Sequence, residues 1–281
     1  MELSISNANL KNPTSISSFT EGQSKAYVEL IDWINAAYNP NDNKRALIGP
    51  AGTGKTYLVR ALITNSNLSY STIGVAAPTH KACRVLQESI NLPNIKASTL
   101  QSDLGLRLNF DVDKFDINNP PFDPKGRIKI DKYKIYIVDE SSMINKGLCT
   151  FLEKICKSKE CKLLYIGDSY QLPPVNEYKS MAFEGIRKYE LTEIVRQEED
   201  NPVLSLLNIL RDDIKNNKNN FLAYLMNNKS RFDADNIKGY AVMNNDDFCK
   251  EMLTYFSDEQ ITKNVDFVKI IAYTNRAVGN W

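Results

Sequence analysis

A glycine-rich octapeptide that ends in a lysine and a threonine carries the clearest chemistry in the chain. Gly49-Pro-Ala-Gly-Thr-Gly-Lys55-Thr56 has the spacing G-x-x-x-x-G-K-[ST] and directly follows the apolar run Ala46-Leu-Ile48. Such glycines let backbone N–H groups face a phosphate, the lysine reaches the β and γ phosphates, and the threonine hydroxyl can ligate Mg²⁺. The next residues, 57–63, are predicted to be helical, so a helix N-terminus also faces the anion. The alternative, a glycine turn that binds nothing, leaves this full set of residues unexplained.

Two adjacent carboxylates form a second chemical motif. The alternating, β-rich run Tyr133-Lys-Ile-Tyr-Ile-Val138 ends in Asp139-Glu140. In nucleotide hydrolases with a phosphate loop, an acid at the end of a neighbouring strand holds the metal ion, and a second acid can polarise the attacking water. We expect Asp139 in the first role and Glu140 in the second. An ordinary acidic strand end is the alternative, and the nearby phosphate loop argues against it.

The elements that must position these motifs alternate between strand and helix. Apolar strands are expected before Gly49, over residues 71–77, 135–138 and 162–166, with helices over residues 20–37, 81–90 and 147–157. Uninterrupted apolar strands between helices predict a buried parallel sheet, and functional residues then lie at the carboxyl ends of its strands. The predicted fold class is therefore α/β.

Two regions depart from this alternation. Residues 106–132 contain prolines, a glycine and alternating stretches, which predicts a small inserted subdomain of β-hairpin type. Its basic end, with Lys125, Arg127, Lys129, Lys132 and Lys134, is open to two interpretations, a solvated face or a surface for DNA. From residue 191 onward, helices are expected over 202–216 and 246–256 and a strand over 268–272.

Composition excludes several classes of protein. The 281 residues are 42% hydrophobic and 25% charged with a net charge of +1, so a nucleic-acid surface must be a local patch. Five irregularly spaced cysteines and one histidine give no zinc pattern and suit a reducing cytosol. Residues 1–18 form a polar tail without the features of a signal peptide or membrane anchor. We expect a cytoplasmic, monomeric protein with no membrane partner.

These motifs, in this order, resemble those of superfamily 1 helicases, in particular the RecD-like, Dda-like and Pif1-like 5′-to-3′ branch. The resemblance runs from about Phe19 to about Asn280. It implies a RecA-like first domain over residues 19–190 and a second RecA-like domain that starts at 191 and is incomplete at 281. The last two motifs of the family have no counterpart in this sequence.

The resemblance also assigns the nucleotide site. Phe19-Thr-Glu-Gly-Gln23 is similar to the motif whose glutamine reads adenine, and the same glutamine also suits a capping box. Gly167-Asp-Ser-Tyr-Gln171 resembles the motif whose glutamine senses the γ-phosphate. Leu191-Thr-Glu-Ile-Val-Arg196 resembles the motif whose arginine reaches the γ-phosphate, with a surface salt bridge as the alternative. The expected catalytic residues are Lys55, Glu140, Gln171 and Arg196, the metal ligands Thr56 and Asp139, and the nucleotide contacts Gln23, Gly49, Pro50, Ala51, Gly52, Thr53, Gly54, Lys55, Thr56 and Tyr57.

Three further motifs resemble the DNA contacts of the family. They are Pro78-Thr-His-Lys81, Ser98-Thr99 and the Thr274-Asn275 pair of the second domain. A strand end followed by a helix N-terminus with hydroxyl, imidazole and amine donors suits phosphates, although Ser98-Thr99 also suits a plain helix N-cap. The expected contacts are Pro78, Thr79, His80, Lys81, Ser98, Thr99, Thr274 and Asn275.

The motifs and the resemblance together predict an ATP-dependent DNA helicase, or its N-terminal motor portion, which couples ATP hydrolysis to movement along single-stranded DNA. Its cofactors would be ATP and Mg²⁺, and replication or repair proteins would be its partners. One alternative is a nucleotide-gated module that binds single-stranded DNA with little turnover. Another is a different phosphate-loop enzyme, such as a small-molecule kinase.

Overall fold

The computed structural model describes residues 13–108, 122–124, 126–195, 201–264 and 267–271, and contacts within the chain divide it into two units. The first unit is Met1–Gln197 and the second is Glu198–Trp281. None of the helices in these described ranges combines the length and apolar character needed to span a bilayer.

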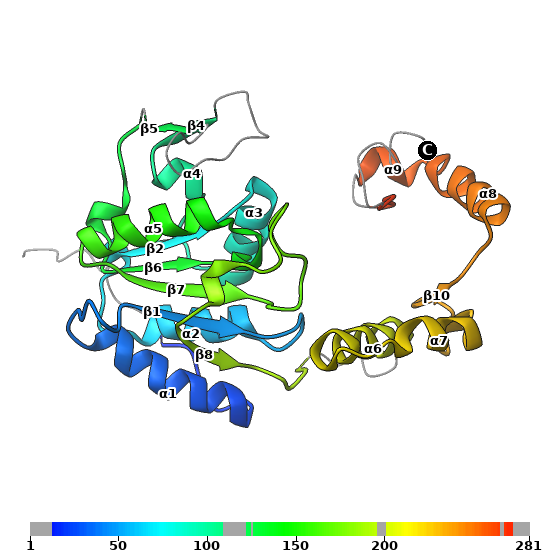
Figure 1. Ribbon diagram of the computed structural model, residues 1–281, viewed down its shortest axis with the longest axis horizontal. Coiled ribbons are helices and arrows are strands. Elements are labelled where there is room, and N and C mark those ends of the chain that lie inside the picture. The colour runs from blue at the N-terminus through cyan, green and yellow to red at the C-terminus, as the bar shows by residue number, and fades with distance from the viewer. Residues whose placement is uncertain (1–12, 109–121, 125, 196–200, 265–266, 272–281) are drawn as a thin grey trace, which may run out of the picture. The chain divides into compact units, whose positions relative to one another are not determined.

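A six-stranded, wholly parallel sheet forms the centre of the first unit, in the order β3-β2-β6-β7-β1-β8. Figure 1 shows β2, β6, β7, β1 and β8 side by side in that order. The strands are β1 (Lys44–Ile48), β2 (Ile73–Ala77), β3 (Ala97–Thr99), β6 (Ile135–Val138), β7 (Lys162–Gly167) and β8 (Arg187–Glu190). The predicted α/β fold class is confirmed, and all strands end at one edge of the sheet.

Consecutive residues of a strand point to opposite faces of the sheet, and here they are apolar on both faces. Helices therefore cover both faces. Leu47, Ile137 and Leu164 pack against α1 (Glu21–Asn35), α2 (Lys55–Asn65) and α3 (His80–Ile90). Their neighbours Ala46, Tyr136 and Tyr165 pack against α4 (Leu100–Asp103) and α5 (Lys146–Ser158). Short 3₁₀ turns, η1 (Tyr70–Thr72), η2 (Ile130–Lys132), η3 (Ser141–Met143) and η4 (Met181–Phe183), complete the connections.

The helix starts follow local capping rules. Thr20 and Gln23 form the predicted capping box of α1, in which each side chain accepts a hydrogen bond from the other residue's backbone N–H. Thr79 caps α3 and Asn145 caps α5 through the same kind of bond. The predicted helices begin within two residues of their positions in the structure.

The segment between α4 and β6 contains a two-stranded antiparallel sheet of β4 (Leu106–Leu108) and β5 (Phe122–Pro124). Figure 1 shows it beyond α4, apart from the main sheet. The backbones of Gly105 and Gly126 lie so close together that a Cβ on either residue would contact backbone atoms of the other. The two ends of the inserted subdomain are thus pinned together by glycines.

The second unit contains four helices and one small sheet within its described residues. The elements are α6 (Pro202–Asn216), α7 (Asn220–Asn227), β9 (Ser230–Phe232), β10 (Gly239–Ala241), α8 (Asn245–Phe256) and α9 (Gln260–Lys263). Buried Asp213 joins α6 to α7 by accepting hydrogen bonds from the Phe221 N–H (2.7 Å) and the Asn220 side chain (3.1 Å). The strand predicted over 268–272 is wrong for residues 268–271, which form no strand, and Ala272 lies outside the described residues.

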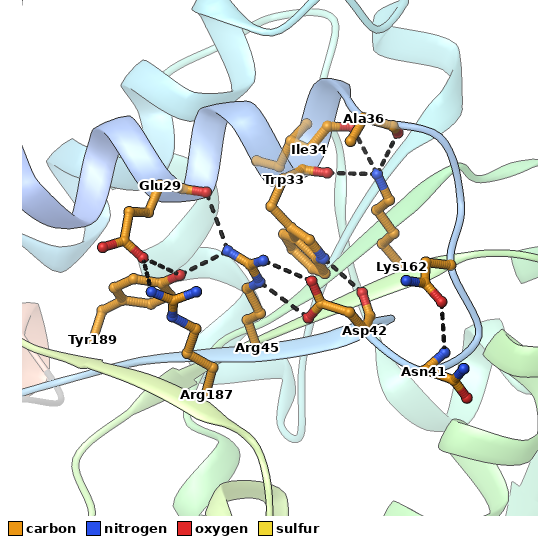
Figure 2. A network of polar contacts seen from close by, with 11 residues as sticks. Glu29, Trp33, Ile34, Ala36, Asn41, Asp42, Arg45, Lys162, Arg187 and Tyr189 are labelled. Carbon is orange, nitrogen blue, oxygen red and sulfur yellow. Dashed lines mark hydrogen bonds and ion pairs between the residues drawn. The ribbon is translucent and has the colours of Figure 1, made fainter.

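A polar network at the amino-terminal edge of the sheet ties α1 to β1, β7 and β8 (Figure 2). Arg45 forms a double contact with Asp42 and donates to the Tyr189 hydroxyl (2.7 Å) and the Glu29 carbonyl (3.2 Å). Buried Lys162 donates to the carbonyls of the last turn of α1. Both cations lie near the ring of Trp33, at 5.1 Å and 5.6 Å from its centroid. The network satisfies the orphan carbonyls at the end of α1 and holds that helix on the sheet.

Leu47→Ala tests this packing. Leu47 is fully buried in the middle of β1, so its truncation should lower the free energy of unfolding of the first unit by about 2–5 kcal/mol. The matched control is Leu172→Ala, since Leu172 is 86% exposed and its truncation should cost less than about 0.5 kcal/mol. Urea denaturation followed by circular dichroism measures both, and equal losses would contradict the described core.

Candidate nucleotide-binding and catalytic site

The octapeptide forms the turn between β1 and α2, where the structure requires glycine at two positions. Gly54 adopts a left-handed conformation (φ +76°), and a Cβ there would collide with the Gln23 side-chain amide. A Cβ on Gly49 would collide with the carbonyl oxygen of Leu191. The loop therefore combines a backbone conformation and close contacts that side chains would prevent.

Side chains brace the loop from within. The Lys55 ammonium curls back and donates to the carbonyls of Gly49 (2.6 Å) and Pro50 (2.8 Å). The buried Thr53 hydroxyl donates to the Pro50 carbonyl at 2.9 Å. Lys55 thus lies over the loop, and Thr56 follows it on the first turn of α2.

Gln23 fastens α1 to this loop. Its side chain is 1% exposed and donates from Nε2 to the Thr53 carbonyl (2.8 Å), while Oε1 accepts the Thr20 N–H (3.1 Å). The predicted cap is confirmed. The predicted adenine contact stays a prediction, and these two bonds leave the second Nε2 proton and the second lone pair of Oε1 for such a contact.

The carboxylates follow β6 as predicted. Asp139 accepts the backbone N–H of Glu140 at 2.9 Å, and Glu140 adopts a left-handed conformation (φ +51°) that a non-glycine residue rarely occupies. Burial raises the pKa of Asp139. Burial and the charges of Asp139 and Asp168 raise the pKa of Glu140, and Lys55 opposes the rise in both. A strained backbone and perturbed carboxylates at a strand end are features of functional sites.

One cleft of about 520 Å³ joins these groups. It is lined by residues from the phosphate loop, the start of α2 and the ends of β6 and β7. The predicted site residues that line it are Ala51, Gly52, Gly54, Lys55, Thr56, Tyr57, Asp139, Glu140 and Gln171. Gln171 reaches the cleft on an exposed turn in which Asp168 accepts the Tyr170 N–H at 3.0 Å.

The cleft also has lining residues that carry no predicted role, namely Arg60, Val85, Ser89, Gly167, Asp168 and Val195. Arg60 was detectable in principle, because it lies one helical turn after Thr56 on the same face of α2. Val85 and Ser89 come from α3, and no local pattern brings that helix beside α2. Packing alone places them.

A strap of residues 191–195 lies against the phosphate loop. Leu191 donates its N–H to the Ile48 carbonyl (2.8 Å), and Val195 donates to the Gly52 carbonyl (2.9 Å). Glu193 accepts the N–H of Gly22 at the start of α1 (3.3 Å). Arg196, the next residue, lies outside the described residues, as do Thr274 and Asn275.

The predicted DNA contacts of the first unit gather at the carboxyl ends of β2 and β3, where Ala77 pairs with Thr99. Pro78 is half-buried, and Thr79, His80 and Lys81 are exposed. The hydroxyl of Thr79 accepts the Ala82 N–H (3.1 Å) as the cap of α3.

Ser98 and Thr99 have local roles in the structure. Ser98 donates to the buried Asp103 carboxylate, and the Thr99 hydroxyl caps α4 by accepting the Ser102 N–H at 3.3 Å. The N-cap alternative therefore holds for Thr99. DNA contact by these two side chains stays a prediction. Ser98 would have to exchange its present acceptor for a phosphate, whereas Thr99 only accepts in its cap and its O–H can still donate.

The donors in the cleft fit Mg²⁺. Among the described residues, no group of three or more His, Cys, Asp or Glu side chains is arranged to hold a metal ion. Thr56 and Asp139 line the same cleft with oxygen ligands, and Mg²⁺ prefers one or two such ligands together with substrate phosphates and waters. These two residues would hold the ion.

The family of this chain follows from comparison with known proteins. The AAA domain family matches residues 29–227, which include the phosphate loop, the acidic strand end and the turn with Gln171. The chain belongs to the AAA domain family. An uncharacterized protein, R530, of Acanthamoeba polyphaga mimivirus is 32% identical over 155 residues, which cover 50% of this chain and 31% of that protein.

A second relative bears on the resemblance to helicases. The ATP-dependent RecD2 DNA helicase of Deinococcus radiodurans is 28% identical over 164 residues, or 56% of this chain and 20% of that helicase. The match confirms the resemblance to RecD-like helicases. The chain thus aligns with less than a third of the length of either curated relative. Among solved structures, a Bacteroides Pif1 in complex with ADP-AlF4 gives a TM-score of 0.49 at 20% identity, covering 93% of this chain and 55% of that one.

Asp139→Asn should separate stability from function. The change removes a half-buried charge whose desolvation outweighs its attraction to Lys55, and it keeps an oxygen for the Glu140 N–H. The nucleotide-free protein should therefore melt at a higher temperature. It also weakens the expected metal site. Wild-type protein at 100 times its dissociation constant for Mg·ATP should gain about 2.7 kcal/mol, and the variant should gain much less. Thermal melts with and without Mg·ATP measure both, and an equal gain would exclude Asp139 from the site.

Proposed function

We propose that this chain is an ATP-hydrolysing helicase motor portion that acts on single-stranded DNA. The observation that carries the proposal is the single cleft in which the phosphate loop, with Lys55 and Thr56, meets the carboxylates of Asp139 and Glu140. A cation for phosphates, two metal ligands and a base candidate in one cleft suit phosphoryl transfer to water.

Each group would have a distinct role in that reaction. The loop N–H groups and Lys55 would bind the β and γ phosphates, and Thr56 and Asp139 would hold the Mg²⁺ that neutralises their charge. Glu140 would orient and polarise the attacking water. Its raised pKa makes it a stronger base than an ordinary glutamate. Gln171 would sense the γ-phosphate from the turn after β7, and Arg196 would stabilise the transferred charge.

The DNA would run along the carboxyl edge of the sheet. The exposed residues Thr79, His80 and Lys81 lie at this edge, which also carries the nucleotide cleft. Donors of this kind contact the phosphate backbone without reading sequence. The resemblance to RecD-like helicases supports movement in the 5′-to-3′ direction, and the part of the chain from residue 191 would begin a second RecA-like domain.

Measurement of ATP turnover with and without single-stranded DNA distinguishes the helicase from two alternatives. A nucleotide-gated DNA-binding module would bind Mg·ATP and single-stranded DNA with little hydrolysis. Another phosphate-loop enzyme would hydrolyse or transfer phosphate without response to DNA. The helicase proposal requires ATP turnover that single-stranded DNA stimulates.

Glu140→Gln should separate binding from chemistry. The substitution keeps the size and hydrogen bonding of the side chain and removes its basicity, so turnover should fall at least about tenfold while Mg·ATP affinity is retained. Lys55→Ala is the companion variant, and both its affinity and its turnover should fall because a charge on the phosphates is removed. Steady-state hydrolysis and a fluorescent-nucleotide titration provide the two readouts. Loss of nucleotide binding in Glu140→Gln would show that the roles of Asp139 and Glu140 are wrongly divided.

His80→Ala combined with Lys81→Ala should test the DNA track. Thr79 is left intact because its hydroxyl caps α3. The double variant should bind a labelled single-stranded oligonucleotide more weakly, with a salt slope lower by about 0.7 for each DNA phosphate that is no longer neutralised. Lys188→Ala, an exposed lysine on β8, is the control. If fluorescence anisotropy over a salt series gives the same affinity for all three proteins, the track is in the wrong place.

A further inference from the structure

A basic region lies around the basic end of the inserted subdomain, away from the nucleotide cleft. Two cavities, of about 510 Å³ and 390 Å³, adjoin there and share Asp131 and Lys132 in their walls. The larger is formed by the end of α1, the turn before β6 and the turn before β7. The smaller is lined by Arg127, Lys129, Asp131 and Lys132.

The charge of this region is strongly positive. Its walls carry six basic side chains, Arg127, Lys129, Lys132, Lys134, Lys159 and Lys162, against the acidic Asp131 and Glu160, whereas the whole chain has a net charge of only +1. We call this set of residues the amino-edge basic face. Six basic against two acidic side chains leave a local excess of four positive charges, as a near-neutral protein requires if it is to attract a polyanion.

Two of these cations have structural partners. Lys162 is buried and occupied by the carbonyls of Trp33, Ile34 and Ala36, as Figure 2 shows. Because it neutralises the negative end of the α1 dipole, those carbonyls offer little repulsion to an anion in the adjoining cavity. Lys129 lies 3.6 Å from the buried carboxylate of Asp103.

The other cations are exposed and have no acidic partner among the described residues. Within the described ranges, no carboxylate lies within ion-pair distance of Lys134 or Lys159, and Arg127 and Lys132 are exposed as well. The Lys132 ammonium lies over the ring of Tyr133, at 4.9 Å from its centroid. Unpaired ammonium groups on one face repel one another unless an anion lies between them.

The face offers charge without a platform for bases. Tyr133 and Tyr38, the aromatic residues in its walls, are half-buried, and Lys132 lies over the Tyr133 ring. Single-stranded nucleic acid is bound largely by stacking of its bases on exposed aromatic rings, whereas a duplex presents only phosphates to such a face. The chemistry therefore favours a duplex backbone over a single strand.

We propose that the amino-edge basic face binds the phosphate backbone of duplex DNA, independently of sequence. The proposal rests on the proposed function, because a motor on one strand works beside a duplex. The face lies where β6 and β7 begin, and the nucleotide cleft lies where they end. Strands of four to six residues separate these edges by about 13–20 Å, so the two sites are distinct and duplex binding needs no nucleotide.

The test is the binding of a fluorescein-labelled 20-base-pair duplex to the full chain, without nucleotide, over a salt series. The Lys134→Gln/Lys159→Gln variant should weaken binding at least about tenfold at 50 mM salt and lower the salt slope by about 2. Lys25→Gln/Lys188→Gln removes the same net charge from exposed positions elsewhere and should change both values little. Arg127→Gln provides a second, single-charge variant if the double variant melts at a lower temperature.

Each outcome is decisive. Equal affinity of wild type and the Lys134/Lys159 variant overturns the proposal, and so does an equal loss in the Lys25/Lys188 control, which would indicate diffuse attraction. If the Lys134/Lys159 substitutions weaken binding to vesicles with 30% phosphatidylserine more than binding to the duplex, the face is assigned to a membrane and the proposal is overturned too. DNA-stimulated ATP turnover of the same variants tests the proposed function separately, since these lysines are remote from the cleft.

Discussion

The balance between one ammonium group and several carboxylates in the nucleotide cleft is the interaction on which the rest of the site depends. Lys55 lies over the phosphate loop and lowers the cost of ionising Asp139 and Glu140, while burial and Asp168 raise that cost for Glu140. The lining of the cleft has three carboxylates, of Asp139, Glu140 and Asp168, against the two cations Lys55 and Arg60, and this excess of negative charge favours a bound cation. Mg²⁺ with a triphosphate would supply the missing positive charge and give Lys55 new anionic partners.

The scaffold keeps these groups in place by contacts that are distant in sequence. Gln23 ties α1 to the loop through Thr53, and the strap of residues 191–195 touches the loop from another side. The parallel sheet brings the loop, the acids and the turn with Gln171 to one edge. Arg45 contacts the middle of α1 and Lys162 contacts its last turn, whereas Gln23 near its start contacts the phosphate loop, so α1 is bonded to both edges of the sheet.

Sequence patterns predict the features that depend only on residues close together in the chain. The capping box at Thr20, the loop at Gly49–Thr56 and the acids after β6 could be read from spacing, because turns, caps and strand ends depend on near neighbours. No pattern in the sequence predicts the edge strand β8, because its residues are largely exposed and lack an apolar run. The local use of Ser98 depends on Asp103 and on Tyr136, which lies 33 residues beyond that aspartate, so no pattern in the sequence could assign it. Val85 and Ser89 line the cleft only because α3 packs beside α2, which no sequence pattern shows.

The most direct test of the central claim is a calorimetric titration of the wild-type chain with a non-hydrolysable ATP analogue, in Mg²⁺ and in EDTA. The account predicts one nucleotide per chain, with binding in Mg²⁺ at least about tenfold tighter than in EDTA, because the carboxylates of the cleft repel a triphosphate without a metal ion. Equal affinity in Mg²⁺ and EDTA, or no binding in either, would contradict the assignment of this cleft as a metal-dependent nucleotide site.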